Sequence, residues 1–233
     1  EYHALTHSTQ FIVNLMMENY NIDVIHLTML TESSMQELLD IDTDFFLVFQ
    51  LDFLVGFLVS NNKKVVSVPM FDQSGGLPRA HWAMQTGALV ISYSETLTRQ
   101  LVAWNLQHVS AKYYPSASEE RVQFHDGLRV FFWERIPSQG CDVDWVASIC
   151  RNMLIRPTHV HVHLWPDPGE VPSTGSAHIA RAFPYARVSV SNRFRDKSEY
   201  WDALRLCNVF IAPRKVEGIG MAFLEAMSLG MVV

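Results

Sequence analysis

Apolar residues along the chain alternate between two spacings, and this alternation predicts helices and strands in turn. Short apolar runs bounded by turn residues predict strands, and apolar residues three or four positions apart predict helices that bury one face. In the first half, the predicted helices span 8–19, 33–39, a segment directly after Gln50, and 94–105, and the predicted strands span 24–27, 45–50, 64–68, 88–92 and 111–114. This order is typical of parallel β-α-β units.

A polar break at residues 115–127 interrupts the pattern, which then resumes. Beyond it, the predicted strands span 128–133, 159–164, 187–190 and 209–212, and the predicted helices span 143–153, 177–182, 197–206 and 221–229. We therefore predict two Rossmann-like domains, at residues 1–118 and 119–233. The expected fold class is α/β.

Composition narrows the class of protein. Hydrophobic residues make up 48% of the chain and charged residues 18%, which suits a packed core and argues against disorder. A net charge of −6 argues against a general nucleic-acid surface. The three cysteines, Cys141, Cys150 and Cys207, show no paired spacing, and no signal peptide opens the chain, so we expect a cytoplasmic protein.

The most apolar stretch, residues 45–59, is shorter than the ~20 residues that a membrane-spanning helix needs. Gln50 and Asp52 interrupt it, which favours a buried strand followed by a buried helix. Contact with a membrane surface through that helix is the less favoured alternative.

The most informative segment is the last one, where a glycine turn separates two glutamates. Glu217 lies on the turn with Gly218 and Gly220, and Glu225 lies on the helix that follows. Glycines allow a tight turn close to a ligand, and a helix N-terminus suits a diphosphate. Both carboxylates are expected to face the crevice at the carboxyl end of the sheet, where open α/β sheets bind ligands.

Residues 217–233, EGIGMAFLEAMSLGMVV, resemble the E-x7-E signature of retaining, nucleotide-sugar-dependent glycosyltransferases of family four. These enzymes have the GT-B architecture of two Rossmann-like domains, the first mainly for the acceptor and the second for the nucleotide sugar. Residues 208–214 sit where the family has its preceding strand, and residues 90–97 and 112–115 are similar to first-domain segments. The resemblance implies a hexosyltransferase-type enzyme of polysaccharide biosynthesis that acts on a glycan, lipid-linked or other acceptor, with peripheral membrane association as one option. By this resemblance, the catalytic residues are Glu217 and Asp72, and the donor-binding residues are Arg135, Gly218, Ile219, Gly220, Met221, Ala222 and Glu225.

The match at Arg135 is incomplete. Arg135 follows a strand where the family has an arginine that contacts the donor diphosphate through its bidentate fork. The family usually adds a lysine a few residues later, but residues 136–140, IPSQG, contain none. A strand-end arginine that pairs with a surface carboxylate is the alternative interpretation.

Asp72 precedes the sequence Ser74-Gly75-Gly76, which we interpret as a loop that closes on a ligand. The residue resembles a first-domain aspartate that faces the cleft in the family. It could hold a sugar hydroxyl, or it could be a turn residue.

We expect no metal and no cofactor. Three alternating histidines at residues 159–163 share one face of a strand, but their spacing is poor for one tetrahedral ion, so we predict hydrogen-bonded histidines. Two D-x-D matches, at residues 42–44 and 142–144, are explained by turns and helix caps.

Two alternatives stay open beside the transferase: a nucleotide-sugar epimerase with the same architecture, and a non-catalytic module that binds a nucleotide or a partner protein. The pattern ends at Val233 inside an expected strand. We therefore expect the second domain to be incomplete, and residues 1–233 alone not to turn over. The donor sugar, its nucleotide and the acceptor are not specified by these residues.

Overall fold

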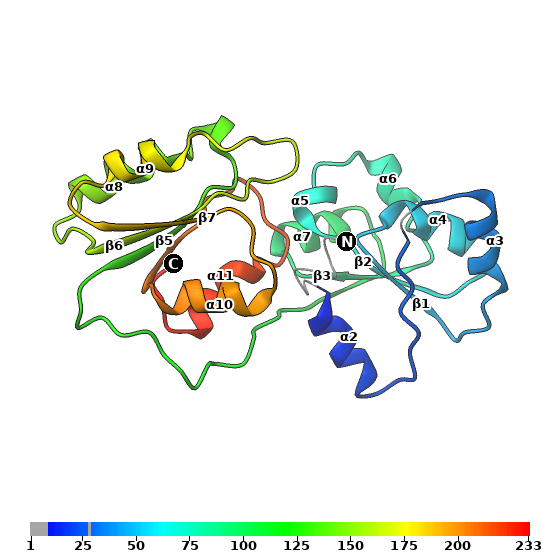
Figure 1. The fold of residues 1–233 in the computed structure, drawn as a ribbon. Coiled ribbons are helices and arrows are strands. Elements are labelled where there is room, and N and C mark those ends of the chain that lie inside the picture. The colour runs from blue at the N-terminus through cyan, green and yellow to red at the C-terminus, as the bar shows by residue number, and fades with distance from the viewer. Residues whose placement is uncertain (1–8, 28) are drawn as a thin grey trace. The chain divides into compact units, whose positions relative to one another are not determined.

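The computed structural model describes residues 9–27 and 29–233, which form two compact units. The N-terminal unit contains Thr9–Tyr113 together with Val216–Ile219. The C-terminal unit contains Tyr114–Lys215 and Gly220–Val233. Each unit holds a four-stranded sheet in which every strand pair is parallel (Figure 1). The predicted α/β fold class is therefore confirmed.

The sheet of the N-terminal unit has the strand order β1-β2-β3-β4. Its strands are β1 (Phe46–Phe49), β2 (Val65–Val68), β3 (Leu89–Ser92) and β4 (His108–Ser110). Its helices are α2 (Gln10–Met17), α3 (Glu32–Asp40), α4 (Asp52–Ser60), α5 (Phe71–Ser74), α6 (Arg79–Ala83) and α7 (Glu95–Ala103).

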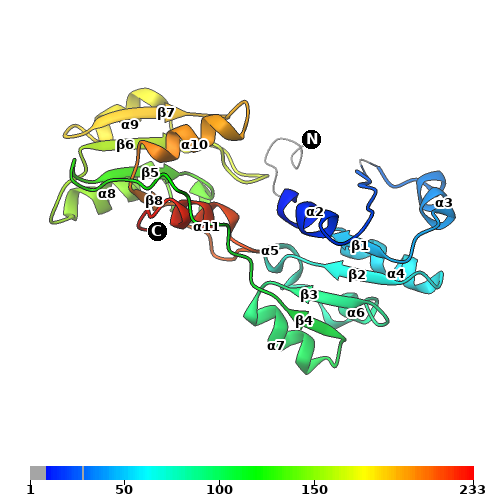
Figure 2. The same cartoon turned by 90° about the horizontal axis from the view of Figure 1, so that it is seen from below.

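Side chains that alternate along these strands bury both faces of the sheet. Val48 and Val65 pack on one face with residues of α4, and Val90 packs there with α6 and α7. Val68 packs on the opposite face with Ile12 of α2 (Figure 2). The apolar segment at residues 45–59 thus forms β1 and α4, both part of the core. None of the helices within residues 9–27 and 29–233 combines the length and the apolar character needed to cross a membrane.

Three local predictions in this unit were wrong. Residues 24–27 form no strand: Val24 and Ile25 are exposed and have no ladder partner in the described part of the chain. The last strand of this unit, β4, spans His108–Ser110 and pairs with β3. It ends before the strand that was predicted at residues 111–114. Asp72 lies in the short helix α5 instead of an open loop, and Ser74 of that helix is buried and donates a hydrogen bond to the Asp52 carboxylate.

The sheet of the C-terminal unit has the strand order β7-β6-β5-β8. Its strands are β5 (Arg129–Trp133), β6 (His159–His163), β7 (Arg187–Ser191) and β8 (Val209–Ile211). Its helices are the 3-10 turn η1 (Pro137–Gln139), α8 (Val143–Asn152), α9 (Ser176–Ala182), α10 (Lys197–Arg205) and α11 (Met221–Ser228).

This sheet is also covered on both faces, with α8 and α9 on one side and α10 and α11 on the other (Figure 1). Val160 and Val162 of β6 face α8 and α9, where they pack with Phe132. Phe131 of β5 faces α10 and α11, and His161 of β6 stacks on its ring. A parallel sheet buried on both faces is the arrangement expected of a Rossmann-like domain.

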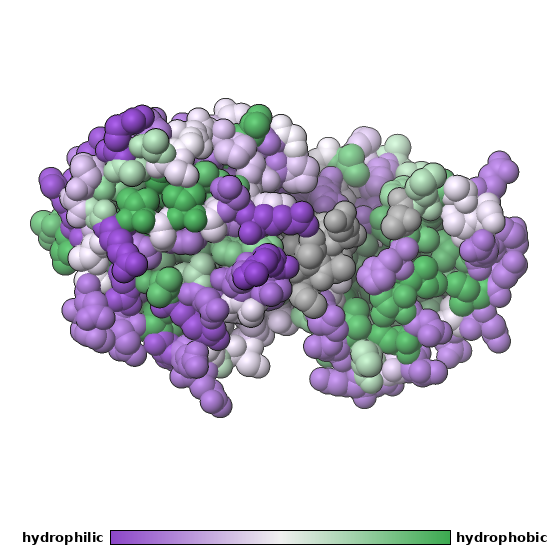
Figure 3. Space-filling view, viewed as in Figure 1, coloured by the Kyte–Doolittle hydropathy of each residue, from purple (hydrophilic) through white to green (hydrophobic). Residues whose placement is uncertain are grey.

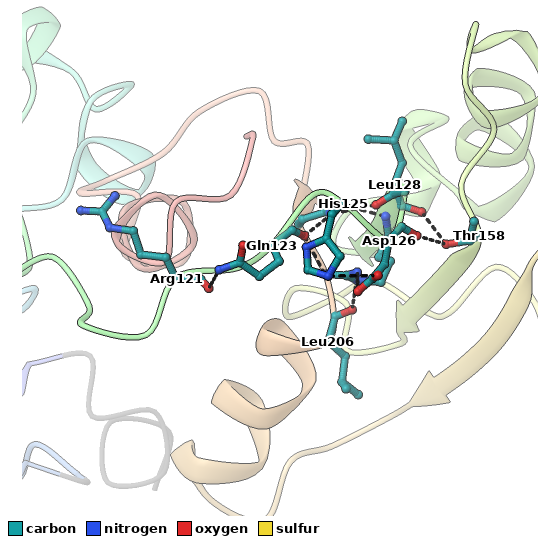
Figure 4. Close-up of polar contacts among 10 residues, drawn as sticks. Arg121, Gln123, His125, Asp126, Leu128, Thr158 and Leu206 are labelled. Atoms are coloured by element: carbon teal, nitrogen blue, oxygen red, sulfur yellow. Dashed lines mark hydrogen bonds and ion pairs between the residues drawn. The ribbon is translucent and has the colours of Figure 1, made fainter.

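The polar break at residues 115–127 is anchored to the C-terminal unit. The Ser118 and Val122 backbone N–H groups donate to the carbonyls of Ser228 and Leu229, at 3.0 Å each. Further along, Arg129 donates to the carbonyls of Gln123 and Leu206 at 2.7 and 2.9 Å, beside the hydrogen bonds of Thr158 (Figure 4). Backbone groups of the segment take part in these hydrogen bonds, and its Asp126 carboxylate lies 3.4 Å from the Arg129 guanidinium group.

Candidate functional site

The carboxyl ends of β5, β6, β7 and β8 lie at one edge of the C-terminal sheet, because the strands are parallel. The segments that follow them therefore gather at this edge, where open α/β sheets bind ligands. Hydrophilic residues also collect on the surface over α10 and the segment before it (Figure 3). Charged residues that follow these four strands include Arg135, Asp167, Arg193, Lys197 and Arg214, and the buried Glu134 directly follows β5.

Arg135 contacts the Asp167 carboxylate at this edge. Its Nε atom lies 3.1 Å from Oδ1 of Asp167, and its guanidinium group lies over the Trp133 ring at 4.9 Å. Oδ2 of the same carboxylate lies 2.9 Å from Nε of Arg214. All three charged side chains are less than 20% exposed, at 10% for Arg135, 17% for Asp167 and 19% for Arg214. The ion pair predicted as an alternative role of Arg135 is thus present, but it is largely buried and involves two arginines.

Glu225 is buried on α11 and forms an ion pair with Lys197, the first residue of α10. The Lys197 ammonium lies 2.7 Å from Oε1 of Glu225 and 4.5 Å from the centre of the Tyr200 ring. Burial, and then the neighbouring Glu225 carboxylate, raise the pKa of the Tyr200 hydroxyl well above its usual value of 10.0. The Glu225 carboxylate therefore lies beside the Lys197 ammonium group and the Tyr200 side chain.

The glycine turn before α11 adopts the backbone conformation that its sequence predicts. Gly220 is the N-cap of α11 and has φ 76° and ψ 37°, a left-handed conformation that glycine adopts without the steric cost of a Cβ. No side chain in the described part of the chain caps this helix end. The backbone N–H groups of Met221 and Ala222 belong to the first turn, where a helix has no internal acceptors, so they suit an anion.

Glu217, Gly218 and Ile219 belong to the N-terminal unit. Ile219 packs against the cluster that contains Met70, and a Cβ on Gly218 would lie 3.0 Å from both Oδ1 of Asp72 and Sδ of Met70. Gly218 is thus required for close approach to α5. The two glutamates of the motif belong to different units, Glu217 to the N-terminal and Glu225 to the C-terminal unit.

The three histidines of β6 form a continuous ladder of hydrogen bonds with two serines of β7. The prediction that these histidines are hydrogen-bonded is therefore confirmed. Ser189 lies 2.8 Å from both His159 Nε2 and His161 Nδ1. Ser191 lies 2.9 Å from His161 Nε2 and 2.8 Å from His163 Nδ1. Within the described residues, no group of three or more His, Cys, Asp or Glu side chains is arranged to hold a metal ion.

Burial lowers the pKa of the ladder histidines. The pKa of His161 falls to about 4 and that of His163 to about 3, from 6.5, mainly through burial and then through the next histidine in the ladder. Both side chains are therefore neutral in the folded protein at neutral pH. In the unfolded chain the same histidines have their usual pKa of 6.5, so below that pH they bind protons that the folded protein does not bind. The free energy of unfolding therefore falls as the pH is lowered.

We accordingly predict acid destabilisation that begins below pH 6.5. The contribution of the two neutral histidines to the free energy of unfolding is complete above pH 6.5, the pKa in the unfolded chain. It is lost as the pH falls toward the folded pKa values of about 4 for His161 and about 3 for His163. Each histidine contributes a slope of ~1.4 kcal/mol per pH unit in this window. Urea unfolding at pH 7, 6 and 5 measures the slope. His161→Gln should flatten it, and the exposed loop variant His125→Gln should not; equal slopes in both variants would refute the assignment.

The second D-x-D match has the structural role that was predicted. Asp142 is the N-cap of α8, and its carboxylate accepts a hydrogen bond from the Trp145 N–H at 2.8 Å. Asp144, in the first turn, lies 2.8 Å from His178 Nε2. In the first match, Thr43 donates to the Phe45 carbonyl in the turn before β1.

Sequence reasoning missed Lys197, Asp167 and Arg214. Lys197 and Asp167 lie 28 and 32 residues from the partners they bind, Glu225 and Arg135, and no local pattern links them. Arg214 had a usable signal, since it is the last residue of the segment 208–214 that resembles the family and it precedes the motif.

No protein-family model and no curated protein sequence matches the chain. Among solved structures, the fold is similar to the lipopolysaccharide outer core galactosyltransferase WaaB in its apo form, with a TM-score of 0.53 and 16% sequence identity. The match covers 85% of this chain and 58% of that protein, so the chain spans somewhat more than half of its length. The two parallel sheets and this likeness together show an α/β fold of the two-domain, Rossmann-like GT-B type.

Proposed function

We propose that the protein is a glycosyltransferase that moves a hexosyl-type sugar from a nucleotide-diphosphate donor to a glycan, lipid-linked or other acceptor, with retention of configuration. One observation carries the proposal. Arg135, the uncapped start of α11 and the buried carboxylate of Glu225 lie at the carboxyl edge of one parallel sheet. The likeness of the fold to a galactosyltransferase supports it.

The chemistry follows from the charges that develop during transfer. As the bond between the anomeric carbon and the diphosphate breaks, negative charge grows on the phosphate and positive charge grows on the sugar ring. Arg135 and the N–H groups at the start of α11 would stabilise the departing diphosphate. Glu225 would accept hydrogen bonds from the ribose hydroxyls, and Glu217 and Asp72 would act on the transferring sugar.

The roles of the two units follow the same proposal. The C-terminal unit would bind the nucleotide sugar, and the N-terminal unit would bind the acceptor. A cytoplasmic location and peripheral contact with a membrane that carries a lipid-linked acceptor are part of this hypothesis.

We predict that sugar transfer does not need a metal ion. Cationic side chains and a helix terminus would perform the charge neutralisation for which other enzymes use a divalent cation. Transfer by the full-length protein should proceed at its full rate in excess EDTA. Loss of activity that manganese restores would overturn this prediction.

The function is tested on the full-length protein with a panel of nucleotide sugars and acceptors, with nucleotide release and the sugar product followed together. A transferase should release the nucleotide and attach the sugar to an acceptor with the donor's anomeric configuration. An altered sugar without attachment would indicate an epimerase, and binding without any turnover would indicate a non-catalytic module. Either result would contradict the proposed function.

A further inference from the structure

The turn between α8 and β6 presents two aliphatic side chains to solvent. Leu154 has a relative exposure of 102% and Ile155 of 62%. The turn that carries them is anchored at its end, because Pro157 is buried and both the N–H and the hydroxyl of Thr158 donate to the Leu128 carbonyl (Figure 4). The exposed pair is therefore held at the amino edge of the C-terminal sheet, at the opposite end of the strands from the candidate donor site.

The apolar surface continues from this tip along the outer side of α8. Trp145, Ile149 and Met153 are spaced four residues apart, so they lie on one side of the helix. Trp145 is exposed and the other two are half-buried, and together with Ser148 and Asn152 they line an open hollow of about 440 Å³. Contiguous exposed apolar surface of this kind marks a site of interaction with a partner or a membrane.

Three exposed arginines flank the tip. Arg151 lies in the last turn of α8, Arg156 directly follows the tip, and Arg187 is the first residue of β7, the neighbouring strand. The Arg187 N–H donates to the Thr158 carbonyl at 2.9 Å, and the Arg156 guanidinium group lies over the Tyr185 ring at 5.4 Å. Among the residues that the structure describes, no ion pair involves any of the three arginines.

The local charge at the tip is positive, although the net charge of the chain is −6. The sequence contains no aspartate or glutamate between Asp144 and Asp167. Asp144, at the start of α8, is paired with His178, and Asp126, before β5 at the amino edge, is paired with Arg129. An anionic surface repels the protein as a whole, so it can attract the protein only where cations are concentrated, as they are here.

We propose that the C-terminal unit docks through this patch, formed by Leu154, Ile155, Arg151, Arg156 and Arg187, on a membrane surface that carries anionic lipids. The two aliphatic side chains would insert at the boundary between headgroups and acyl chains, and the guanidinium groups would bind lipid phosphates. The inference rests on the proposed function for its purpose, since a lipid-linked acceptor lies in such a membrane.

Shape and charge favour a membrane over the other occupants of this patch. A projecting aliphatic tip enters a fluid bilayer without a matching pocket, whereas a protein partner would have to supply one. A second copy of the chain would set the same arginines against one another across a two-fold interface, which like charges oppose.

The test is flotation of the full-length protein with phosphatidylcholine vesicles, with and without phosphatidylglycerol. The unaltered protein should bind the anionic vesicles, more weakly at high salt, and should hardly bind phosphatidylcholine alone. Arg151→Gln combined with Arg156→Gln should weaken binding ~25-fold, because each arginine near an anionic surface contributes about fivefold. Leu154→Ser combined with Ile155→Ser should weaken it ~10–100-fold and leave its salt dependence in place.

Matched controls are available on α7 in the N-terminal unit. Arg99→Gln removes an exposed arginine and Val102→Ser removes an exposed aliphatic side chain. Both controls should bind vesicles as the unaltered protein does. Every substitution lies on the surface, so melting temperatures and nucleoside diphosphate affinities should stay unchanged throughout.

The outcomes separate this inference from the proposed function. The inference is overturned if the unaltered protein does not bind anionic vesicles, if binding survives both sets of patch substitutions, or if the α7 controls lose as much. Patch variants that turn a dimer into a monomer while vesicle binding persists would show a second copy as the occupant. Each of these results leaves sugar transfer in solution intact, whereas failure of transfer to any acceptor would contradict the function without changing vesicle binding.

Discussion

In the full-length protein, Glu217→Gln should lower kcat by ~10²–10³-fold while nucleoside diphosphate affinity changes little. Removal of an interaction made mainly in the transition state lowers the rate without weakening the ground-state complex. The substitution is informative because Oε1 of Glu217 accepts a hydrogen bond from the Gly218 N–H at 3.2 Å. Glutamine retains an oxygen for this contact and removes only the charge, so the turn should be preserved.

Steady-state kinetics measures kcat, nucleotide titration measures the affinity, and thermal melting shows whether the fold is preserved. Glu95→Gln, at the exposed start of α7 in the same unit, is the matched control and should retain full activity. A near-normal kcat for Glu217→Gln would remove Glu217 from catalysis. A parallel loss of affinity and thermal stability would instead indicate that the carboxylate serves the turn alone.

Glu225→Ala should weaken nucleoside diphosphate binding by ~10–150-fold, because a carboxylate that binds ribose hydroxyls makes charge-assisted hydrogen bonds of ~1.5–3 kcal/mol. The fold should survive the change. Its ion-pair partner, Lys197, has a side chain that is 29% exposed and can reach water when Glu225 is absent. The melting temperature is checked alongside, since Glu225 is itself buried.

A comparison of ribose and 2′-deoxyribose nucleotides makes the assignment specific. The unaltered protein should prefer the ribose form, and Glu225→Ala should lose most of that preference. A variant that binds the nucleotide unchanged, or that discriminates the two sugars as well as before, would exclude Glu225 from ribose recognition.

The fold was largely predictable because both sheets are buried on both faces and their strands are short, apolar runs. β1, β2, β3 and all four strands of the C-terminal unit lie within a residue or so of their predicted ranges. α5 and α6 were missed because helices of four and five residues are too short to show helical periodicity. The segment 24–27 has a strand-like composition, but composition cannot supply a partner strand.

The sequence predicted only those parts of the candidate site that depend on residues close together in the chain. The turn at Gly218 and Gly220 and the helix α11 follow from the sequence, because glycine conformation and helix capping act over a few residues. The pairing of Lys197 with Glu225 and of Asp167 with two arginines depends on which strands are neighbours in the sheet. That order, β7-β6-β5-β8, is a tertiary property that one sequence does not specify.

A crystal structure of the protein with its tightest-binding nucleoside diphosphate tests the central claim most directly. We expect the diphosphate within hydrogen-bonding distance, ~2.7–3.2 Å, of the Arg135 guanidinium and of the N–H groups at the start of α11. We expect the ribose hydroxyls at the Glu225 carboxylate. A nucleotide bound away from the carboxyl edge of the C-terminal sheet, or one at this edge whose phosphates contact neither Arg135 nor α11, would contradict the proposed donor site.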